Sequence, residues 1–137
     1  MEITNEQKQN ISELARKHGL SLVVLFGSQA TGKTHPKSDV DIGVAKRRSS
    51  VEGAEVPIIE IESELVVILK RDDVEVVNIY NVSPTLMRSV VEEGKALYES
   101  SPDEFSEWKL YAIRVWMETN WLRERARAHL KEWAKQL

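Results

Sequence analysis

The segment LSLVVLFGS at residues 20–28, followed after ten further residues by DVDIGVA at residues 39–45, decides the fold of this chain. The first run is apolar, rich in β-branched side chains and closed by Gly27, which is typical of a buried strand. The second run alternates apolar residues with polar or small ones, which is the period of a strand. We therefore expect two strands, joined over residues 28–38 by a polar loop or by a short helix and a loop.

The end of the first strand and the start of the second carry residues suited to phosphate chemistry. Gly27 lets the backbone turn sharply and approach a ligand closely, and Ser28 adds a hydroxyl and backbone N–H groups that suit phosphate oxygens. Asp39 and Asp41 stand two residues apart on a strand, so both carboxylates point to one side. Carboxylate oxygens suit Mg²⁺, and a pair of such ions stabilises both the attacking and the leaving oxygen of a phosphoryl displacement.

A site of this kind usually takes a third carboxylate from a neighbouring strand. The apolar run at residues 74–79 predicts that strand, and it offers Glu75, with Asp73 on the same face. The predicted metal-binding and catalytic residues are Asp39, Asp41 and Glu75. The predicted nucleotide-binding residues are Gly27, Ser28, Lys37 and Ser38. Further basic residues that flank the site and could neutralise a triphosphate are Lys33, Arg47 and Arg48.

Capping signals predict the helices. Thr4 with Gln7 forms a capping-box pattern before a helix that ends near Gly19, and a helix is expected over residues 57–70. Ser83-Pro84 and Ser101-Pro102 place a capping residue before a first-turn proline, so helices begin there. Residues 96–98 are expected to be extended.

The final helical segment carries an apolar stripe from Phe105 to Trp133 at steps of mostly three and four residues. Unbroken to the end of the chain, it would be roughly 50 Å long, which exceeds the width of the rest of the domain. We therefore expect it to break near Thr119-Asn120 or to overhang. Trp116 and Trp121 lie off the stripe and are candidates for an exposed surface.

Composition bounds the class of protein. The 137 residues suit one domain, and the proportions of hydrophobic (42%) and charged (30%) residues are those of ordinary globular proteins. A formal net charge of -3 leads us to expect no direct nucleic-acid partner, and the absence of cysteine excludes disulfides and thiolate chemistry. No apolar run approaches the ~20 residues that span a bilayer, and the polar N-terminal stretch has no signal-peptide pattern. We expect a cytoplasmic protein with no membrane partner.

Residues 27–34, GSQATGKT, also fit the P-loop pattern of Gly, four residues and Gly-Lys-Thr. A P-loop must open a substantial helix whose N-terminus holds the phosphates. Here His35-Pro36 follows at once, and proline disfavours the α conformation in the residue before it. A P-loop NTPase is therefore an alternative that the local context disfavours.

Taken together, these segments resemble the minimal nucleotidyltransferases (MNT) of the polymerase β superfamily. The resemblance is carried by LFGS at 25–28, DVDI at 39–42, VEVVNI at 74–79, Ser83-Pro84 and EGKALY at 93–98. The charged helical segment that follows resembles the members that act as antitoxins of HEPN-domain ribonuclease toxins.

The resemblance implies an α+β (mixed α/β) fold, with a small mixed sheet, helices packed on one side and a long C-terminal helical segment. We divide the chain into a nucleotidyltransferase domain at residues 1–100 and a helical extension at residues 101–137 that packs on the same domain. The implied activity is Mg²⁺-dependent transfer of AMP from ATP to a tyrosine hydroxyl of a cognate HEPN toxin, which is thereby silenced. The toxin is the expected partner, in a complex that could be oligomeric.

Matched to the family pattern, Gly27 and Ser28 hold the phosphates, and Asp39 and Asp41 bind the metals. Glu75 falls where the family usually has Asp, and Asn78 where many relatives have a second Asp. The extra methylene of Glu75 displaces its carboxylate by about an ångström, an error that can cost ~10²-fold in rate. A catalytically weak or inactive antitoxin that neutralises the toxin by binding is therefore an alternative.

The expected reaction is in-line attack of a hydroxyl on the α-phosphorus of ATP, with Asp41 or Glu75 as the base and pyrophosphate as the leaving group. An enzyme that modifies a small molecule is a further alternative, disfavoured because the chain lacks an evident second domain to form a substrate cleft.

Overall fold

The computed structural model describes residues 1–31, 39–46 and 55–137. Its helices are α1 (Asn5–Lys17), α2 (Ser28–Thr31), α3 (Ile58–Leu69), α4 (Pro84–Glu93), α5 (Glu104–Glu118) and α6 (Asn120–Lys135). Its strands are β1 (Leu22–Phe26), β2 (Val40–Ala45), β3 (Val74–Asn78) and β4 (Lys95–Glu99). These elements confirm the strands and helices expected from the sequence, including a short helix directly after Gly27. The predicted start of α5 was wrong: the helix begins at Glu104 with Asp103 as its N-cap, and Ser101-Pro102 lies before it. The Ser101 hydroxyl donates to the Glu104 carboxylate and does not cap the backbone.

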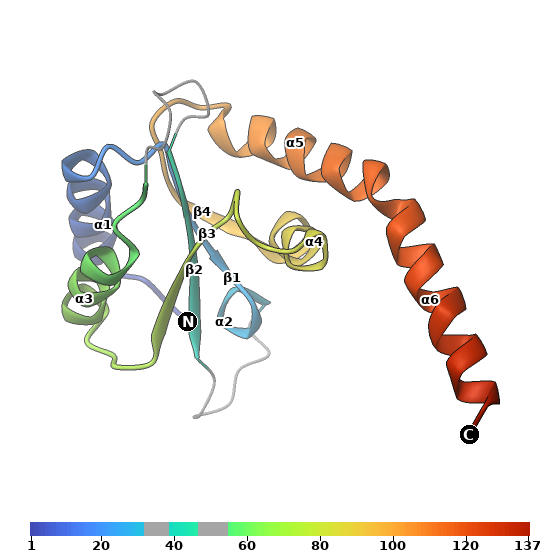
Figure 1. Ribbon diagram of the computed structural model, residues 1–137. Coiled ribbons are helices and arrows are strands. Elements are labelled where there is room, and N and C mark those ends of the chain that lie inside the picture. The colour runs from blue at the N-terminus through green and yellow to red at the C-terminus, as the bar shows by residue number, and fades with distance from the viewer. Residues whose placement is uncertain (32–38, 47–54) are drawn as a thin grey trace.

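The four strands form one mixed sheet in the order β3-β2-β1-β4 (Figure 1). β1 runs antiparallel to both of its neighbours, β2 and β4, whereas β2 and β3 are parallel and are connected through α3. Parallel strands need such a crossover, and the sheet is therefore built around one βαβ unit. The α+β class is confirmed.

Helices cover both faces of the sheet, and not one face as the resemblance led us to expect (Figure 1). α1 and α3 pack on one face, against a core that includes Val40, Ile42 and Val44 of β2. α4 and the first half of α5 pack on the other face, against side chains that include Val24 and Phe26 of β1. All five residues of β1 are buried because the central strand is covered from both sides.

Local signals set the helix ends. The Thr4 hydroxyl accepts the Gln7 backbone N–H at 3.1 Å and the Gln7 side chain accepts the Thr4 N–H, so the predicted capping box closes. The Ser83 hydroxyl likewise accepts the backbone N–H of Leu86 at the start of α4. α3 ends at Lys70, which adopts the left-handed conformation and so turns the chain back toward β3.

The C-terminal segment breaks, and its second half overhangs. α5 is anchored by Phe105, Trp108 and Ala112, which are buried against the sheet, whereas α6 has no buried residue. The break falls at Thr119, as expected from the sequence. Within the parts of the chain described, no helix has the length and apolar character needed to cross a bilayer.

Candidate active site

Strand register brings the predicted carboxylates together at one end of the sheet. Asp41 of β2 lies opposite Phe26 of β1 on one side and opposite Glu75 of β3 on the other. Directly paired residues of adjacent strands project from the same face, and Asp39 precedes β2 by one residue. The pairing begins where the Val40 backbone N–H donates to the carbonyl of Asp73 at 3.0 Å.

The carboxylates belong to the face covered by α4 and α5. Val40 and Ile42 are buried in the core under α1 and α3. Because successive strand residues alternate between faces, Asp41 points to the opposite side, the side of Phe26. Asp41 is half-buried there, whereas Asp39 and Glu75 are exposed.

The electrostatics of this end of the sheet show a concentration of negative charge. Burial raises the pKa of the Asp41 carboxyl above its ordinary value, and the charges of Glu75 and Asp39 raise it further. Like charges held this close disfavour ionisation of the most buried member. A cation would relieve both effects, which is the electrostatic character of a metal site.

Gly27 closes β1 directly against this cluster. Its φ of +75° lies in the left-handed region, and a Cβ atom built on it would overlap the Asp41 carboxylate. A residue with a side chain would meet both a conformational penalty and a clash. Ser28 follows as the first residue of α2, so its hydroxyl and backbone lie beside the same bend.

The sequence did not predict the role of Arg71. Its guanidinium donates two hydrogen bonds to the Asp73 carboxylate, at 2.8 and 2.6 Å. This pair lowers the pKa of the Asp73 carboxyl, and Asp73 serves to fix Arg71 at the start of β3. The charge of Asp39 is among the causes that raise the pKa of Arg71, so a cation stands beside the carboxylates. An Arg two residues before an Asp was the signal available in the sequence.

Several predicted nucleotide contacts fall outside the described residues. These are Lys37 and Ser38, together with the flanking basic residues Lys33, Arg47 and Arg48. They stay predictions.

The residues present fit Mg²⁺. Asp39, Asp41 and Glu75 offer only oxygen donors, which a small hard cation prefers, and they come from two paired strands. The exposed side chains of Asp39 and Glu75 can rotate toward an ion shared with Asp41. The absence of a Cβ at Gly27 leaves space for the Asp41 carboxylate beside the bend.

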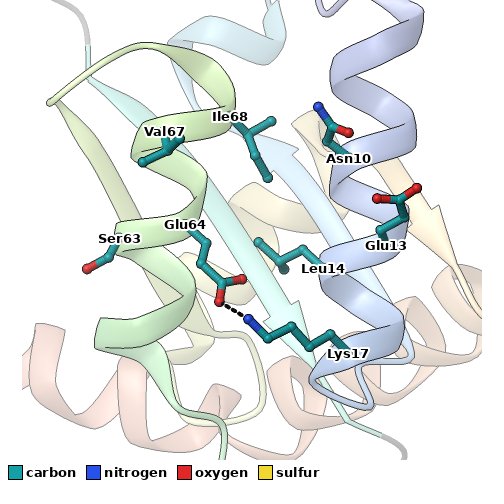
Figure 2. Close-up of a pocket in the computed structure, with 8 residues that line it drawn as sticks. All are labelled: Asn10, Glu13, Leu14, Lys17, Ser63, Glu64, Val67 and Ile68. Atoms are coloured by element: carbon teal, nitrogen blue, oxygen red, sulfur yellow. Dashed lines mark hydrogen bonds and ion pairs between the residues drawn. The ribbon is translucent and has the colours of Figure 1, made fainter.

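A second group of titratable side chains lies on the other face of the sheet, beside a groove between α1 and α3 (Figure 2). The ligand atoms of His18, Glu60 and Glu64 lie within 4.8 Å of one another, closer together than the three carboxylates of the candidate site. However, Lys17 donates to Glu64 at 2.6 Å, and His18 Nε2 lies 3.1 Å from the other oxygen of Glu64. The ammonium already compensates this carboxylate, so the group is an ion-pair network that ties α1 to α3.

The P-loop alternative loses its structural basis. A P-loop requires a substantial helix after the Lys-Thr of its glycine-rich turn, but the strand β2 begins at Val40, only six residues after Thr34. This strand pairs directly with β1.

The family described as "Polymerase beta, Nucleotidyltransferase" matches residues 9–103. The chain belongs to this nucleotidyltransferase family. It is similar to the protein adenylyltransferase MntA of Shewanella oneidensis, with 32% identity over 117 residues that cover 84% of this chain and 77% of the relative. It is also similar to the MntA of Aphanizomenon flos-aquae, with 31% identity over 96 residues that cover 66% of this chain and 64% of the relative.

Solved structures of toxin-antitoxin complexes share the fold. A toxin-antitoxin crystal structure with AMP-PNP matches with a TM-score of 0.72 and 25% identity, covering 90% of this chain and 98% of that chain. A tri-AMPylated Shewanella oneidensis HEPN toxin in complex with an MNT antitoxin matches with a TM-score of 0.67 and 23% identity, covering 91% of this chain and 96% of that chain. The resemblance to the minimal nucleotidyltransferases is thus confirmed.

Proposed function

We propose that this chain transfers AMP from ATP to a tyrosine hydroxyl of a cognate HEPN-domain toxin, and that it thereby acts as the antitoxin. Two relatives at 31% and 32% identity are protein adenylyltransferases, which supports a protein acceptor. The match to a toxin-antitoxin structure with AMP-PNP, an ATP analogue, supports the nucleotide and the class of partner. The observation in this chain that carries the proposal is the register of Asp41 opposite Glu75, beside the Gly27 bend. We place the activity in the cytoplasm, where ATP is available.

In the mechanism, Asp39, Asp41 and Glu75 would hold Mg²⁺, and Gly27 and Ser28 would bind the phosphates of ATP. Bound Mg²⁺ would supply positive charge that balances the triphosphate and the developing charge on pyrophosphate. The acceptor oxygen forms a bond to the α-phosphorus, and the bond from that phosphorus to the bridging oxygen breaks. Pyrophosphate leaves with the electron pair, and a carboxylate, Asp41 or Glu75, accepts the hydroxyl proton.

The chain contributes mainly position and charge to this reaction. The strand pairing that begins at Val40 and Asp73 fixes the spacing between the carboxylates of β2 and β3. The bend at Gly27 brings the phosphate-binding backbone within contact of the Asp41 carboxylate. Both features come from backbone geometry, which needs little rearrangement when substrates bind.

The proposal is tested by intact-mass spectrometry of a cognate HEPN toxin, after incubation with the chain, ATP and Mg²⁺. We expect the toxin to gain one or more adenylyl groups. Asp41→Asn should slow this transfer by about 100-fold or more, because a metal ligand supplies several kcal/mol of transition-state stabilisation. Asp72→Asn is the matched control, since Asp72 is exposed in the turn before β3 and should leave the rate unchanged.

Two outcomes would contradict the proposal. Inhibition of the toxin without any mass gain would show neutralisation by binding, the alternative suggested by Glu75 in place of the usual Asp. Full transfer activity in an Asp39→Asn, Asp41→Asn double variant would show that these carboxylates do not hold the metal.

A further inference from the structure

The last helix, α6, stands away from the rest of the chain that is described. None of its 16 residues is buried, and in Figure 1 it runs beside the body of the molecule (orange to red). Leu122, Leu130 and Trp133 are 49%, 61% and 57% exposed. Contiguous apolar surface of this kind marks an interaction site on a folded protein.

Contacts among Trp116, Thr119 and Arg123 at the helix break fix the direction of α6, and we call them the joint. The Thr119 hydroxyl donates to the carbonyl of Val115 at 2.6 Å, a back-bond that bends helices. The Arg123 guanidinium donates to the same hydroxyl at 2.7 Å and lies 3.4 Å from the centre of the Trp116 ring. Trp116 is therefore half-buried in the joint and does not join the exposed surface expected from the sequence, whereas Trp121 is 56% exposed.

The apolar side chains of α6 continue the row that anchors α5. On α5, Trp108 and Ala112 are buried and Val115 is half-buried against the core under α4. The row continues beyond the break at steps of three and four residues, and we call its α6 members, Leu122, Ala126, Leu130 and Trp133, the arm row. The helix face that the domain covers in α5 is thus uncovered in α6.

The charge of α6 is opposite to that of the whole chain. The helix has five basic residues (Arg123, Arg125, Arg127, Lys131 and Lys135) and two acidic ones (Glu124 and Glu132), a net charge of +3. The chain as a whole has a net charge of -3, which leaves -6 for the remainder. At about 100° per residue, Arg125 and Arg127 lie on the two sides of the arm row. A complementary surface is therefore apolar at its centre and acidic at its borders.

We propose that the arm row docks the protein that receives AMP, through an apolar surface bordered by acidic side chains, and that it holds this protein against the carboxylate site. The inference rests on the proposed function. α6 lies on the same side of the sheet as α2 and α4, and its C-terminal end reaches the level of α2 in the view of Figure 1. Asp41 faces that side. A protein seated on the arm row therefore presents its surface to the carboxylates, which favours the acceptor over other occupants.

The test is isothermal titration of the full-length chain with the HEPN toxin in the absence of ATP. A Leu130→Ala, Trp133→Ala double variant should bind about 10- to 30-fold more weakly, since buried Trp side chains dominate interfaces. Glu124→Ala is the matched control, because Glu124 is exposed, lies on the opposite side of α6 from the arm row at about 100° per residue, and should change the affinity less than about 2-fold. Neither variant touches the core, and a circular dichroism melt checks that both fold.

A second readout separates docking from chemistry. In the AMP-transfer assay, the double variant should raise KM for the toxin while kcat at saturating toxin stays that of the wild type. If the toxin binds through the arm row but gains no AMP, the docking inference stands and the proposed enzymatic function fails.

Three binding results would overturn the inference. They are wild-type affinity of the double variant, absence of toxin binding by the wild-type chain, and loss of affinity in Met117→Ala alone, which would move the surface to α5. Analytical ultracentrifugation tests whether a second copy of the chain occupies the arm row. Self-association that disappears in the double variant would assign the arm row to that second copy and overturn the inference.

Discussion

Gly27 is required for two separable reasons, one conformational and one steric. Its positive φ is a backbone state that side chains rarely tolerate, and the space where a Cβ would sit is taken by the Asp41 carboxylate. Gly19 shares only the first reason. Its φ is +66°, and no atom lies within 4 Å of the position of a Cβ. Substitutions at the two glycines can therefore separate the effect of backbone strain from the effect of a clash with the Asp41 carboxylate.

We expect Gly27→Ala to lower the free energy of unfolding by about 1–3 kcal/mol and to slow AMP transfer by about 100-fold, because the displaced Asp41 carboxylate no longer meets its ligands. Gly19→Ala should cost about 1–2 kcal/mol and leave the transfer rate unchanged. Urea denaturation and the mass assay measure the two effects. Equal transfer rates in the two variants would contradict the steric argument.

Neutralising Glu75 should make the metal-free protein more stable. A carboxyl whose pKa is raised on folding destabilises the folded state once it is ionised, and Glu75 is one cause of the raised pKa of Asp41. At pH 7, Glu75→Gln should raise the melting temperature by about 1–3 °C and abolish most of the activity. Asp72→Asn removes a nearby charge outside the site and serves as the control.

Added Mg²⁺ should then raise the melting temperature of the wild type more than that of Glu75→Gln, since a cation stabilises only the fold that binds it. An equal response of both proteins to Mg²⁺ would remove Glu75 from the proposed metal site.

The sequence was sufficient to predict that Asp39, Asp41 and Glu75 lie at one end and on one face of the sheet, because strand period and spacing determine which side chains share a face. It could not separate Asp73 from Glu75, although both were expected on one face. The difference arises from Arg71, whose two hydrogen bonds engage Asp73 before β3 begins. Contacts of this kind depend on side-chain placement that a strand pattern does not contain.

Among the elements, α1 and α3 are tied by a network with a definite pH dependence. The hydrogen bond from Lys17, and then His18, lower the pKa of Glu64 below its ordinary value of 4.5. A carboxyl with a lowered pKa contributes stability above its unfolded pKa, and that contribution is lost as the pH falls through the folded pKa.

Glu64→Gln should therefore lower the melting temperature by no more than about 4 °C at pH 7, and the difference from the wild type should shrink as the pH falls below the ordinary value of 4.5. Glu60→Gln, one helical turn earlier on the exposed surface of α3, should have a smaller effect at pH 7. Thermal melts across pH 3–8 measure both. A difference that does not shrink on acidification would show that the network acts through packing and not through charge.

Element positions were predictable because caps, prolines and apolar periods act locally, as Thr4 and Ser83 show. The face of the sheet that each helix covers was not predictable. β1 is buried on both sides, so its continuous apolar run does not indicate which side chains point to which face. The break at Thr119 was expected because an unbroken helix would exceed the width of the domain. The angle at the break depends on the contact of Arg123 with Trp116 across it, which the sequence pattern does not contain.

The molecule as a whole combines a compact domain with a projecting helix, α6, that adds nothing to its core. We propose that the boundary between folding unit and extension lies at this joint and not at residue 100, since α5 is buried up to Ala112 and α6 is not buried at all. This division agrees with the inference that α6 makes its contacts outside the chain.

Removing residues 125–137 tests this division while keeping the joint, because Arg123 and Trp116 both remain. The shortened chain should melt within about 2 °C of the full chain, since exposed residues away from core and caps contribute little to stability. Its affinity for AMP-PNP should be unchanged, because the carboxylates, Gly27 and Ser28 all lie before α4. Its affinity for the toxin should fall at least as far as that of the Leu130→Ala, Trp133→Ala variant. A large loss of thermal stability would instead show that α6 belongs to the fold, and the apolar row would then need an intramolecular explanation.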